Sequence, residues 1–303
     1  MSKLMNTHTF TALATPFKED GRIDYDSLDS LIKSQNQAGN ALLLLGSTGE
    51  GISLSAQEKF DILEHVCKKD LSVPILAGIG GVSFQEVLRS LRVYESLPAI
   101  DGYLLTTPVY SKPGPKGQLA WFRSLLDEAS KPCMLYNIPS RAGVSIAPEV
   151  LRELNGHPNF WALKEASGSL EEFRSYRDAS PDIAFYCGND ELMPILVLEG
   201  AKGLVSVMGN VWPEFTRLYV DWSLQRKMIL EGSLLKAIRC VNNRNPVSIK
   251  AILHALGRIA SSHMRLPLSK EDGSDFEDLL EQNFIVDKWT KSKGVVAHVP
   301  INV

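Results

Sequence analysis

Two short stretches of the sequence place reactive side chains at the ends of apolar runs. In LYNIPSRAG, residues 135–143, Tyr136 follows such a run, and in FWALKEASG, residues 160–168, Lys164 does. A lysine at the end of a buried strand costs free energy of desolvation unless its amine is paired or neutral. A neutral amine can attack the carbonyl carbon of a keto acid and form an imine. A lysine that reaches solvent, or one that pairs with Glu165, fits the same pattern.

An imine mechanism also needs a proton donor and acceptor and a site for the carboxylate of the substrate. Tyr136 could shuttle protons, although an aromatic ring that caps a barrel with its hydroxyl in water is the more common arrangement. In GSTGEG, residues 46–51, the glycines let backbone N–H groups converge, and Ser47 and Thr48 add hydroxyl donors. A glycine-rich stretch can equally be a simple turn. The stretch GIGGVS at Gly78 lacks the full dinucleotide-binding pattern.

Eight continuously apolar runs, joined by amphipathic segments, could position these residues. Continuous rather than alternating hydrophobicity is typical of parallel strands that are covered on both faces. The runs start about 20 to 30 residues apart, which leaves room for one strand, one helix and two short loops. One intervening segment opens with Ser55 and has Glu58 three positions later, the capping-box pattern of a helix start. The runs are TFTALATPF from Thr9, ALLLLGSTG from Ala41, VPILAGIG from Val73, GYLLTTPVY from Gly102, PCMLYNIP from Pro132, FWALKEASG from Phe160, IAFYCGND from Ile183 and GLVSVMGN from Gly203.

This alternation predicts an α/β fold, a (β/α)₈ TIM barrel, over residues 1–225. The rest of the chain, residues 226–303, shows helical patterns, and we expect a C-terminal helical extension packed on the barrel. An open doubly wound sheet is the alternative, but it seldom needs eight consecutive β–α units. In TIM barrels chemistry takes place at the carboxyl ends of the strands. The polar residues that end the runs are therefore the candidates for a site: Thr15, Ser47, Thr48, Thr106, Thr107, Tyr136, Lys164, Asn189, Asp190 and Ser206.

The composition of the 303-residue chain excludes several classes of protein. A net charge of −3, with 44% hydrophobic and 22% charged residues, argues against disorder and against a nucleic-acid-binding surface. The four cysteines are widely spaced, without a C-x-x-C pair, and we expect reduced thiols. The six histidines are scattered, so a metal site built by the protein is not expected. No apolar run has the length of a signal peptide or a membrane span, and we expect a soluble cytoplasmic protein.

Taken together, these stretches resemble the class I pyruvate-dependent aldolases, the family that includes N-acetylneuraminate lyase. The resemblance extends over roughly residues 8–300. It implies the same barrel fold, an imine-forming lyase activity without a cofactor, and a homotetramer built as a dimer of dimers. The matching stretches, in the order of the family, are GSTGE 46–50, TTPVY 106–110, YNIPSRAG 136–143, LKEASG 163–168 and GLVSV 203–207.

The resemblance assigns roles to the residues that handle pyruvate. Lys164 would form the Schiff base, and Tyr136 would donate and accept protons. Ser47 would link Tyr136 to Tyr110, which would reach in from a neighbouring subunit. Thr48 would bind the pyruvate carboxylate together with backbone amides of its loop. Ser47 stands where one branch of the family usually has threonine, and either residue supplies the hydroxyl that a relay needs.

The resemblance also implies a second substrate. Val205 would contact pyruvate through its backbone, and Arg141 would bind the carboxylate of L-aspartate 4-semialdehyde and steady Tyr136. A planar guanidinium suits a small acidic aldehyde, and the sialate-lyase branch lacks an arginine at this point of the motif. The expected reaction is therefore the condensation of pyruvate with this aldehyde, the first committed step of diaminopimelate and lysine biosynthesis.

Three other interpretations of the same residues stay open. Arg141 could form a surface ion pair of little consequence. The chain could be another aldolase of the family, acting on sialic acid or a 2-keto-3-deoxy sugar acid. Such polyols need hydroxyl-binding side chains after strands six to eight, and EASGSL and GNDE offer some. A catalytically silent barrel that binds a ligand is the third possibility, but the intact lysine, tyrosine and glycine-rich loop argue against it.

One further implication concerns inhibition by lysine. In feedback-sensitive members of the family, lysine binds at the interface of the tight dimer, through polar groups near the GSTGE loop and the catalytic tyrosine. Here the matching positions are Ala56, Lys59, Val82 and Val109, and Glu86 alone keeps an obvious role. Lys59 would bring a positive charge beside the ammonium groups of the ligand. We therefore expect lysine to inhibit weakly or not at all.

Overall fold

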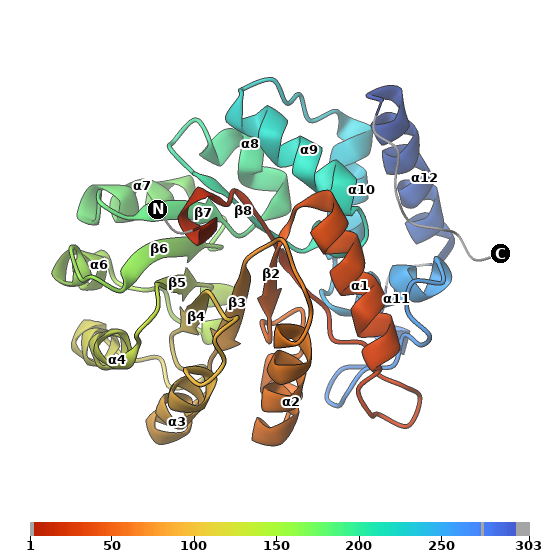
Figure 1. Cartoon of the computed structure of the whole chain (residues 1–303). Helices are drawn as coiled ribbons and strands as arrows, with labels where there is room; N and C mark the ends of the chain where they lie inside the picture. The colour runs from red at the N-terminus through yellow and green to blue at the C-terminus, as the bar shows by residue number, and fades with distance from the viewer. Residues whose placement is uncertain (1–2, 274–275, 295–303) are drawn as a thin grey trace.

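The computed structural model of the chain describes residues 3–273 and 276–294, and eight parallel strands close into a barrel at its centre (Figure 1). Neighbouring strands pair in chain order, and β1 pairs with β8 to close the ring. The predicted TIM barrel is confirmed, and each strand lies within one of the eight apolar runs. The strands are β1 Thr9–Ala12, β2 Ala41–Leu44, β3 Ile75–Ile79, β4 Gly102–Thr106, β5 Cys133–Asn137, β6 Phe160–Glu165, β7 Ala184–Cys187 and β8 Gly203–Ser206.

Helices α1 to α9 lie between and around the strands, and α10 to α12 follow the barrel along the chain (Figure 1). The predicted capping box starts α2, where the side chains and backbone N–H groups of Ser55 and Glu58 bond reciprocally. The helices are α1 Tyr25–Ala38, α2 Ala56–Cys67, α3 Phe84–Tyr94, α4 Pro115–Glu128, α5 Pro139–Ala142, α6 Pro148–Leu154, α7 Leu170–Ala179, α8 Met193–Leu196, α9 Pro213–Leu224, α10 Gly232–Asn242, α11 Val247–Ala255 and α12 Phe276–Ser292, with short 3₁₀ turns η1 Lys3–Asn6, η2 Gly51–Ser53, η3 Asp190–Leu192, η4 Met208–Asn210 and η5 Lys270–Asp272.

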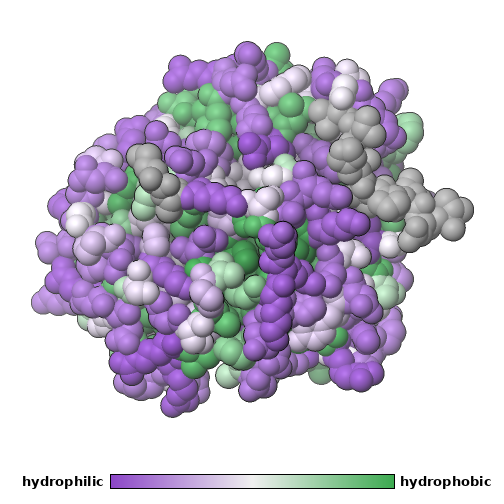
Figure 2. Space-filling model, viewed as in Figure 1, coloured by the Kyte–Doolittle hydropathy of each residue, from purple (hydrophilic) through white to green (hydrophobic). Residues whose placement is uncertain are grey.

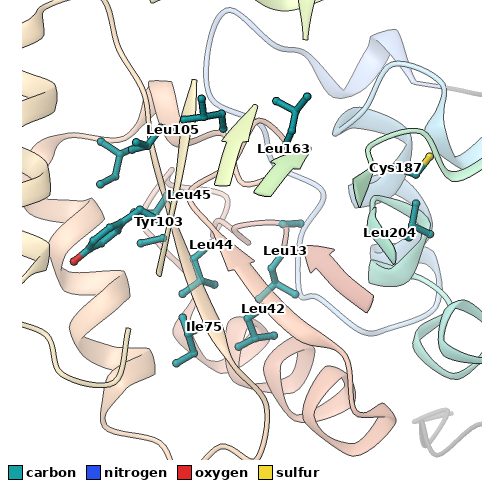
Figure 3. Close-up of a cluster of buried hydrophobic side chains, with 14 of the residues drawn as sticks. Leu13, Leu42, Leu44, Leu45, Ile75, Tyr103, Leu105, Leu163, Cys187 and Leu204 are labelled. Atoms are coloured by element: carbon teal, nitrogen blue, oxygen red, sulfur yellow. The ribbon is translucent and has the colours of Figure 1, made fainter. Parts of the chain in front are cut away.

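The apolar side chains form two separate cores because successive residues of a strand point to opposite faces of the sheet. On β2, Leu43 belongs to the core inside the barrel, whereas Leu42 and Leu44 belong to the larger core between strands and helices. Figure 3 shows Leu42 and Leu44 close to Ile75 of β3 within this outer core. The position of a residue along its strand therefore decides whether its side chain faces the barrel interior or the helices.

Three aromatic rings fill the barrel toward the amino-terminal ends of its strands. The ring centres of Phe10 and Tyr186 lie 5.5 Å apart, and Trp161 lies 6.2 Å from the first and 5.5 Å from the second. The hydroxyl of Tyr186 donates to the backbone carbonyl of Thr7 at 2.7 Å, which satisfies a phenol group that burial would otherwise penalise. The space for a ligand is left at the opposite end of the barrel.

The C-terminal extension consists of helices in the described residues, as the sequence predicts. Helix α12 packs against α9, α10 and α11, and α10 also contacts the turns η3 and η4 that follow β7 and β8. Figure 1 shows α12 beside α10 and α11 at the edge of the barrel. The division into residues 1–225 and 226–303 stays a prediction, and residues 1–2, 274–275 and 295–303 of these ranges lie outside the described residues.

The surface shown in Figure 2 is mainly hydrophilic, and apolar residues lie mostly in recesses between polar ones. Within the described residues no helix combines the length and the apolar composition that a membrane span needs. All four cysteines are free thiols, as predicted. Burial raises the pKa of Cys133 and Cys187 and keeps both in the neutral thiol form.

One ion pair fastens the segment after α11 to the start of α2. Arg265 donates to the carboxylate of Glu58 at 2.8 and 2.5 Å, and to the backbone carbonyl of Gly21 at 2.8 Å. Glu58 also accepts from the backbone N–H of Ser55 at 2.9 Å. These hydrogen bonds, with those from Arg265 the strongest, lower the pKa of Glu58 to about 2 against the cost of partial burial.

We predict that Glu58→Gln lowers the free energy of unfolding by about 2 kcal/mol at pH 7, because Arg265 stabilises the charged carboxylate. Solvent screening of the partly exposed pair keeps this below the value of the full pKa shift. Glutamine retains an acceptor for Ser55, so the capping box persists. Because the folded-state pKa lies below that of the unfolded chain, the stabilisation is complete above pH ~4.5 and is lost as the pH falls toward ~2. Urea unfolding at pH 7, ~4 and ~3 should show the difference between the two proteins narrowing, and a constant difference would contradict the assignment.

Candidate active site

A cavity of about 350 Å³ opens at the carboxyl ends of the barrel strands. Its wall is built from the loops after β2, β5, β7 and β8, from the end of β6, and from α10 and the segment that follows it. A second, more apolar cavity of about 370 Å³ adjoins the first and shares Ser47, Tyr136 and Arg141 with it. The sequence prediction that the chemistry belongs at this end of the barrel matches the place of the cavity.

The amine of Lys164 lies against the ring of Tyr136 inside the barrel mouth. The two residues are register partners on β5 and β6, so their side chains point to the same face. The Nζ atom lies 4.2 Å from the centre of the tyrosine ring, and the two residues are 4% and 6% exposed. Glu165, the next residue, points to the opposite face and accepts from Asn137 Nδ2 at 2.8 Å. The alternative in which Lys164 pairs with Glu165 is therefore not what the structure shows.

Gly188, at the end of β7, makes room for the lysine side chain. A Cβ atom on this residue would lie 3.0 Å from Lys164 Cε and 2.6 Å from Ala166 Cβ. Both distances are shorter than ordinary van der Waals contact, so a side chain here would force the lysine side chain or the chain around Ala166 to shift. Apolar residues such as Ala12, Leu43 and Ala166 contribute to the cavity wall alongside its polar groups.

The glycine-rich loop after β2 brings the hydroxyl of Thr48 to the cavity. Leu45, directly before this loop, and Glu50, within it, both have left-handed backbone conformations, with φ of 61° and 51°. Thr48 is 2% exposed, and its Oγ1 accepts a hydrogen bond from Asn245 Nδ2 at 3.0 Å. Because the oxygen accepts there, the hydroxyl proton is left to donate to a ligand. Ser47 lines the same cavity.

Arg141 reaches the cavity from the one-turn helix α5. Pro139 starts this helix and Gly143 ends it with φ of 79°, so the turn is short and its geometry is well determined. The guanidinium donates to the backbone carbonyl of Asn245 at 2.8 Å, which links the loop after β5 to the C-terminal extension. Arg141 is not part of a surface ion pair among the described residues, and its remaining donors are available to an anion.

Two carboxylates after β7 also line the cavity, and hydrogen bonds hold one oxygen of each. One oxygen of Asp190 accepts from the N–H groups of Val207 at 3.1 Å and Met208 at 2.9 Å. Asn242 donates to the same oxygen at 2.8 Å. Burial raises the pKa of Asp190, and these hydrogen bonds oppose the shift. The neighbouring Glu191 accepts from Arg239 at 2.5 Å. Both acids therefore serve to join the loop after β7 to α10.

The structure brings five of the seven predicted site residues to one cavity and leaves two elsewhere. Ser47, Thr48, Tyr136, Arg141 and Lys164 all line it. Val205 is fully buried in the core inside the barrel, and its predicted backbone contact stays a prediction. Tyr110 is 91% exposed on the loop after β4, with φ of 71°. Its predicted role depends on a second subunit and also stays a prediction.

Within the described part of the chain, no group of three or more His, Cys, Asp and Glu side chains is arranged to hold a metal ion. The groups that meet in the cavity are an amine, a phenol, hydroxyls and a guanidinium. This set is suited to imine formation on a small keto acid, and the guanidinium can bind the carboxylate of a second substrate.

Comparison with known proteins agrees with this geometry. Residues 5–282 match the Dihydrodipicolinate synthetase family. The chain belongs to this family. A 4-hydroxy-tetrahydrodipicolinate synthase from Francisella tularensis subsp. novicida (strain U112) is 41% identical over 292 residues, which cover 95% of this chain and 99% of the relative. The family that the sequence motifs predict is thus confirmed.

Solved structures of the dihydrodipicolinate synthetase family show the same fold. A chloride-inhibited dihydrodipicolinate synthase from Acinetobacter baumannii, complexed with pyruvate, has a TM-score of 0.82 and 27% identity, and the match covers 96% of this chain and 100% of that one. DHDPS from Cyanidioschyzon merolae, with lysine bound, has a TM-score of 0.84 and 31% identity, and the match covers 93% and 98%.

The C-terminal extension adds residues to the site that the sequence analysis missed. In this member of the dihydrodipicolinate synthetase family, Arg239, Asn242 and Asn245 line the cavity. Asn245 contacts both Thr48 and Arg141, which come from opposite sides of the cavity. The signal for these residues is weak, because VNNRNP, residues 241–246, looks like an ordinary polar turn between two helices.

Proposed function

We propose that the chain catalyses the reaction of a 4-hydroxy-tetrahydrodipicolinate synthase, a lyase that condenses pyruvate with L-aspartate 4-semialdehyde. The observation that carries the proposal is that Lys164, Tyr136 and Arg141 meet in one cavity of a chain that belongs to this family. Relatives that bear this name and match nearly the whole chain support it. The reaction would open diaminopimelate and lysine biosynthesis, for which a cytoplasmic location is expected.

The first half of the reaction takes place on the amine of Lys164. The neutral Nζ attacks C2 of pyruvate, the carbonyl oxygen takes up a proton, and loss of water leaves an imine. The imine withdraws electrons, so a proton can leave the methyl carbon and an enamine forms. Tyr136, with its ring 4.2 Å from Nζ, is the acid and base for these transfers. Thr48 holds the carboxylate of pyruvate with amides of its loop, and Val205 contributes a backbone contact.

The second half joins the two substrates. Arg141 binds the carboxylate of aspartate 4-semialdehyde and brings the aldehyde carbon to the enamine. A carbon–carbon bond forms, and the aldehyde oxygen takes up a proton and becomes a hydroxyl. The amino group of the second substrate then attacks the imine carbon and displaces Lys164. This step closes the six-membered ring of the product and returns the free amine of the enzyme.

A sugar-acid aldolase is the alternative within this chemistry, and the contacts of Asp190 and Glu191 argue against it. A polyol chain needs free acceptors along the cavity wall after β7 and β8. Here one oxygen of Asp190 is held by two backbone N–H groups and Asn242, and Glu191 is held by Arg239. A hydroxyl group that bound at either of these two oxygens would compete with a hydrogen bond that joins the loop after β7 to α10.

We predict that Lys164 is the only residue that borohydride traps with pyruvate. The wild-type protein should gain one pyruvate-derived adduct per chain, located on Lys164 by peptide mass spectrometry. Lys164→Ala and Lys164→Arg should gain none, because neither offers an amine that is free to attack. Consumption of pyruvate should then require aspartate 4-semialdehyde, and sialic acid should not be cleaved.

Each result in this experiment separates two functions. Trapping at another lysine contradicts the assignment of the nucleophile. Trapping at Lys164 with cleavage of sialic acid, and no reaction with aspartate 4-semialdehyde, supports the sugar-acid aldolase. The absence of any adduct on a folded wild-type protein supports a ligand-binding barrel without catalysis.

We also propose a homotetramer in which a tight dimer completes each site. Tyr110 is 91% exposed, and two apolar side chains are exposed as well, Ile52 at 75% and Val82 at 57%. Ile52, Val82 and Val109 line a third cavity, of about 590 Å³, next to the glycine-rich loop. An apolar surface of this kind is suited to burial against a second copy of the chain. Tyr110 would there enter the proton relay of the partner through Ser47.

Mixing two inactive variants tests this exchange. Tyr110→Phe and Lys164→Ala should each be nearly inactive alone, and hybrids of the two contain one intact site and one with both defects. Random reassembly makes half of the dimers hybrids, so about a quarter of the wild-type sites should be recovered. Native mass spectrometry shows whether hybrids form. Hybrids without recovered activity, or a fully active monomer, would rule out the shared site.

The third cavity also contains the positions that the sequence analysis connects with lysine inhibition. Ala56, Lys59, Val82, Glu86 and Val109 all line it. Partial burial lowers the pKa of Lys59, and the charge of Glu86 opposes this shift. The carboxylate of Glu86 therefore already interacts with the ammonium group of Lys59 when no lysine ligand is bound.

We predict that lysine inhibits this enzyme only above several millimolar. The side chains of Val82 and Val109 cannot form hydrogen bonds to the ligand. Compared with a feedback-sensitive site, two or three charge-assisted hydrogen bonds are missing, and each would contribute ~1.5–3 kcal/mol to the binding of lysine. An inhibition curve at saturating pyruvate provides the measurement. Lys59→Ala is the matched variant, since it removes the repelling charge and should lower the half-inhibitory concentration. Half-inhibition of the wild type below about 1 mM, equivalent to ~4 kcal/mol of binding, would show that a lysine site exists.

A further inference from the structure

A buried ion pair joins the glycine-rich loop to the C-terminal extension. Lys250 of α11 is 0% exposed and Glu50 is 2% exposed, and the amine donates to the carboxylate. Lys250 also donates to the carbonyl of His263 at 3.1 Å and lies 4.0 Å from the centre of the Phe17 ring. Burial lowers the pKa of Lys250 to about 8, and the charge of Glu50 and its hydrogen bond oppose the shift. Stability alone is a weak reason for such a pair, because apolar side chains of the same size often stabilise a core as well.

Glu50 lies where the glycine-rich loop is most tightly constrained. Its backbone is left-handed, with φ of 51°, and its N–H donates to the carbonyl of Ser47 at 3.1 Å. A Cβ atom on the following Gly51 would lie 2.0 Å from the carbonyl oxygen of Leu45, so the loop is closed on itself without free space. The second carboxylate oxygen of Glu50 accepts from the backbone N–H of Arg265 at 3.1 Å. Both of its oxygens are thus anchored in the extension.

The same extension holds Thr48, two residues earlier in the loop. Asn245, which immediately precedes Pro246 and α11, donates to Thr48 Oγ1 at 3.0 Å. Its carbonyl accepts from Arg141 at 2.8 Å. Lys250 follows Asn245 by five residues and lies on α11. A displacement of α11 would therefore move the contacts of Thr48 and Glu50 together.

We propose that Glu50 and Lys250 are positioning residues for pyruvate, and that they set the glycine-rich loop against α11 so that Thr48 can bind the carboxylate. This inference rests on the proposed function, because it assigns the loop to pyruvate. The pair does not touch the reacting atoms. It acts through the backbone of the loop on one side and through Asn245 on the other, and it makes the extension a part of the substrate site.

Two variants, Glu50→Gln and Lys250→Met, test the proposal. Borohydride trapping at increasing pyruvate concentrations, followed by mass spectrometry, gives the half-saturating concentration for imine formation. We expect it to rise about tenfold or more in both variants. The trapped fraction at saturation and kcat should change by less than about threefold, because Lys164 and Tyr136 are unaltered. Glu50→Gln keeps the shape of the side chain and an acceptor for Arg265, so it remains informative if Lys250→Met does not fold.

Leu253→Ala on the same helix is the matched control. Leu253 is fully buried in the outer core, so its truncation lowers the melting temperature by making a cavity. The half-saturating pyruvate concentration should stay at the wild-type value. An unchanged value in Glu50→Gln, or an equal rise in Leu253→Ala, would show that the ion pair is only structural. A wild-type protein that traps no pyruvate would overturn the proposed function instead, and leave no role for this loop in binding it.

Discussion

The register between β5 and β6 is the constraint on which the site depends. It places Tyr136 directly beside Lys164, and the alternation of side chains along a strand turns both into the barrel mouth. A shift by one residue would turn Lys164 toward the helices and bring Glu165 into the mouth. Glu165 points outward, where its carboxyl group accepts hydrogen bonds from Asn137 and from the N–H of Ser167. Burial raises the pKa of this carboxyl group. The same register therefore satisfies Glu165 and keeps its carboxyl group on the opposite face of the sheet from the amine of Lys164.

The barrel and the extension contribute different things to the cavity. The barrel supplies the reactive groups and, through the aromatic cluster of Phe10, Trp161 and Tyr186, fills the opposite end. The extension supplies several of the polar contacts that hold the loops in place. Asn242 and Arg239 bond the acids after β7, while Asn245 and Lys250 bond residues of the loop after β2. A nucleophile on a strand is positioned by the sheet, whereas a ligand-binding loop needs partners from outside the sheet.

Charged groups near the cavity are arranged so that few are left to compete with a substrate. Glu50 is paired with Lys250, Glu58 with Arg265, and Glu191 with Arg239. Arg141 differs from these pairs, since its contact is a neutral carbonyl rather than a carboxylate. A guanidinium in this state keeps its charge available for an acidic ligand. The electrostatic selectivity that we propose for the second substrate follows from this difference in partners.

The sequence alone determined the fold and the chemical groups of this protein, because both depend on local patterns. Continuous apolar runs predict strands buried on both faces, and motifs such as YNIPSRAG and LKEASG place Tyr136, Arg141 and Lys164 at strand ends. Only the tertiary structure decided which face of β6 Lys164 occupies, and that Asn245 and Lys250 belong to the site. These contacts join residues 197 and 200 positions apart in the chain. An isolated lysine in the apolar stretch VSIKAILHAL was the one local sign of a buried partner, and nothing in its neighbours identified Glu50. Spacing along a chain predicts contacts within an element, but a contact between distant segments is decided by packing and desolvation.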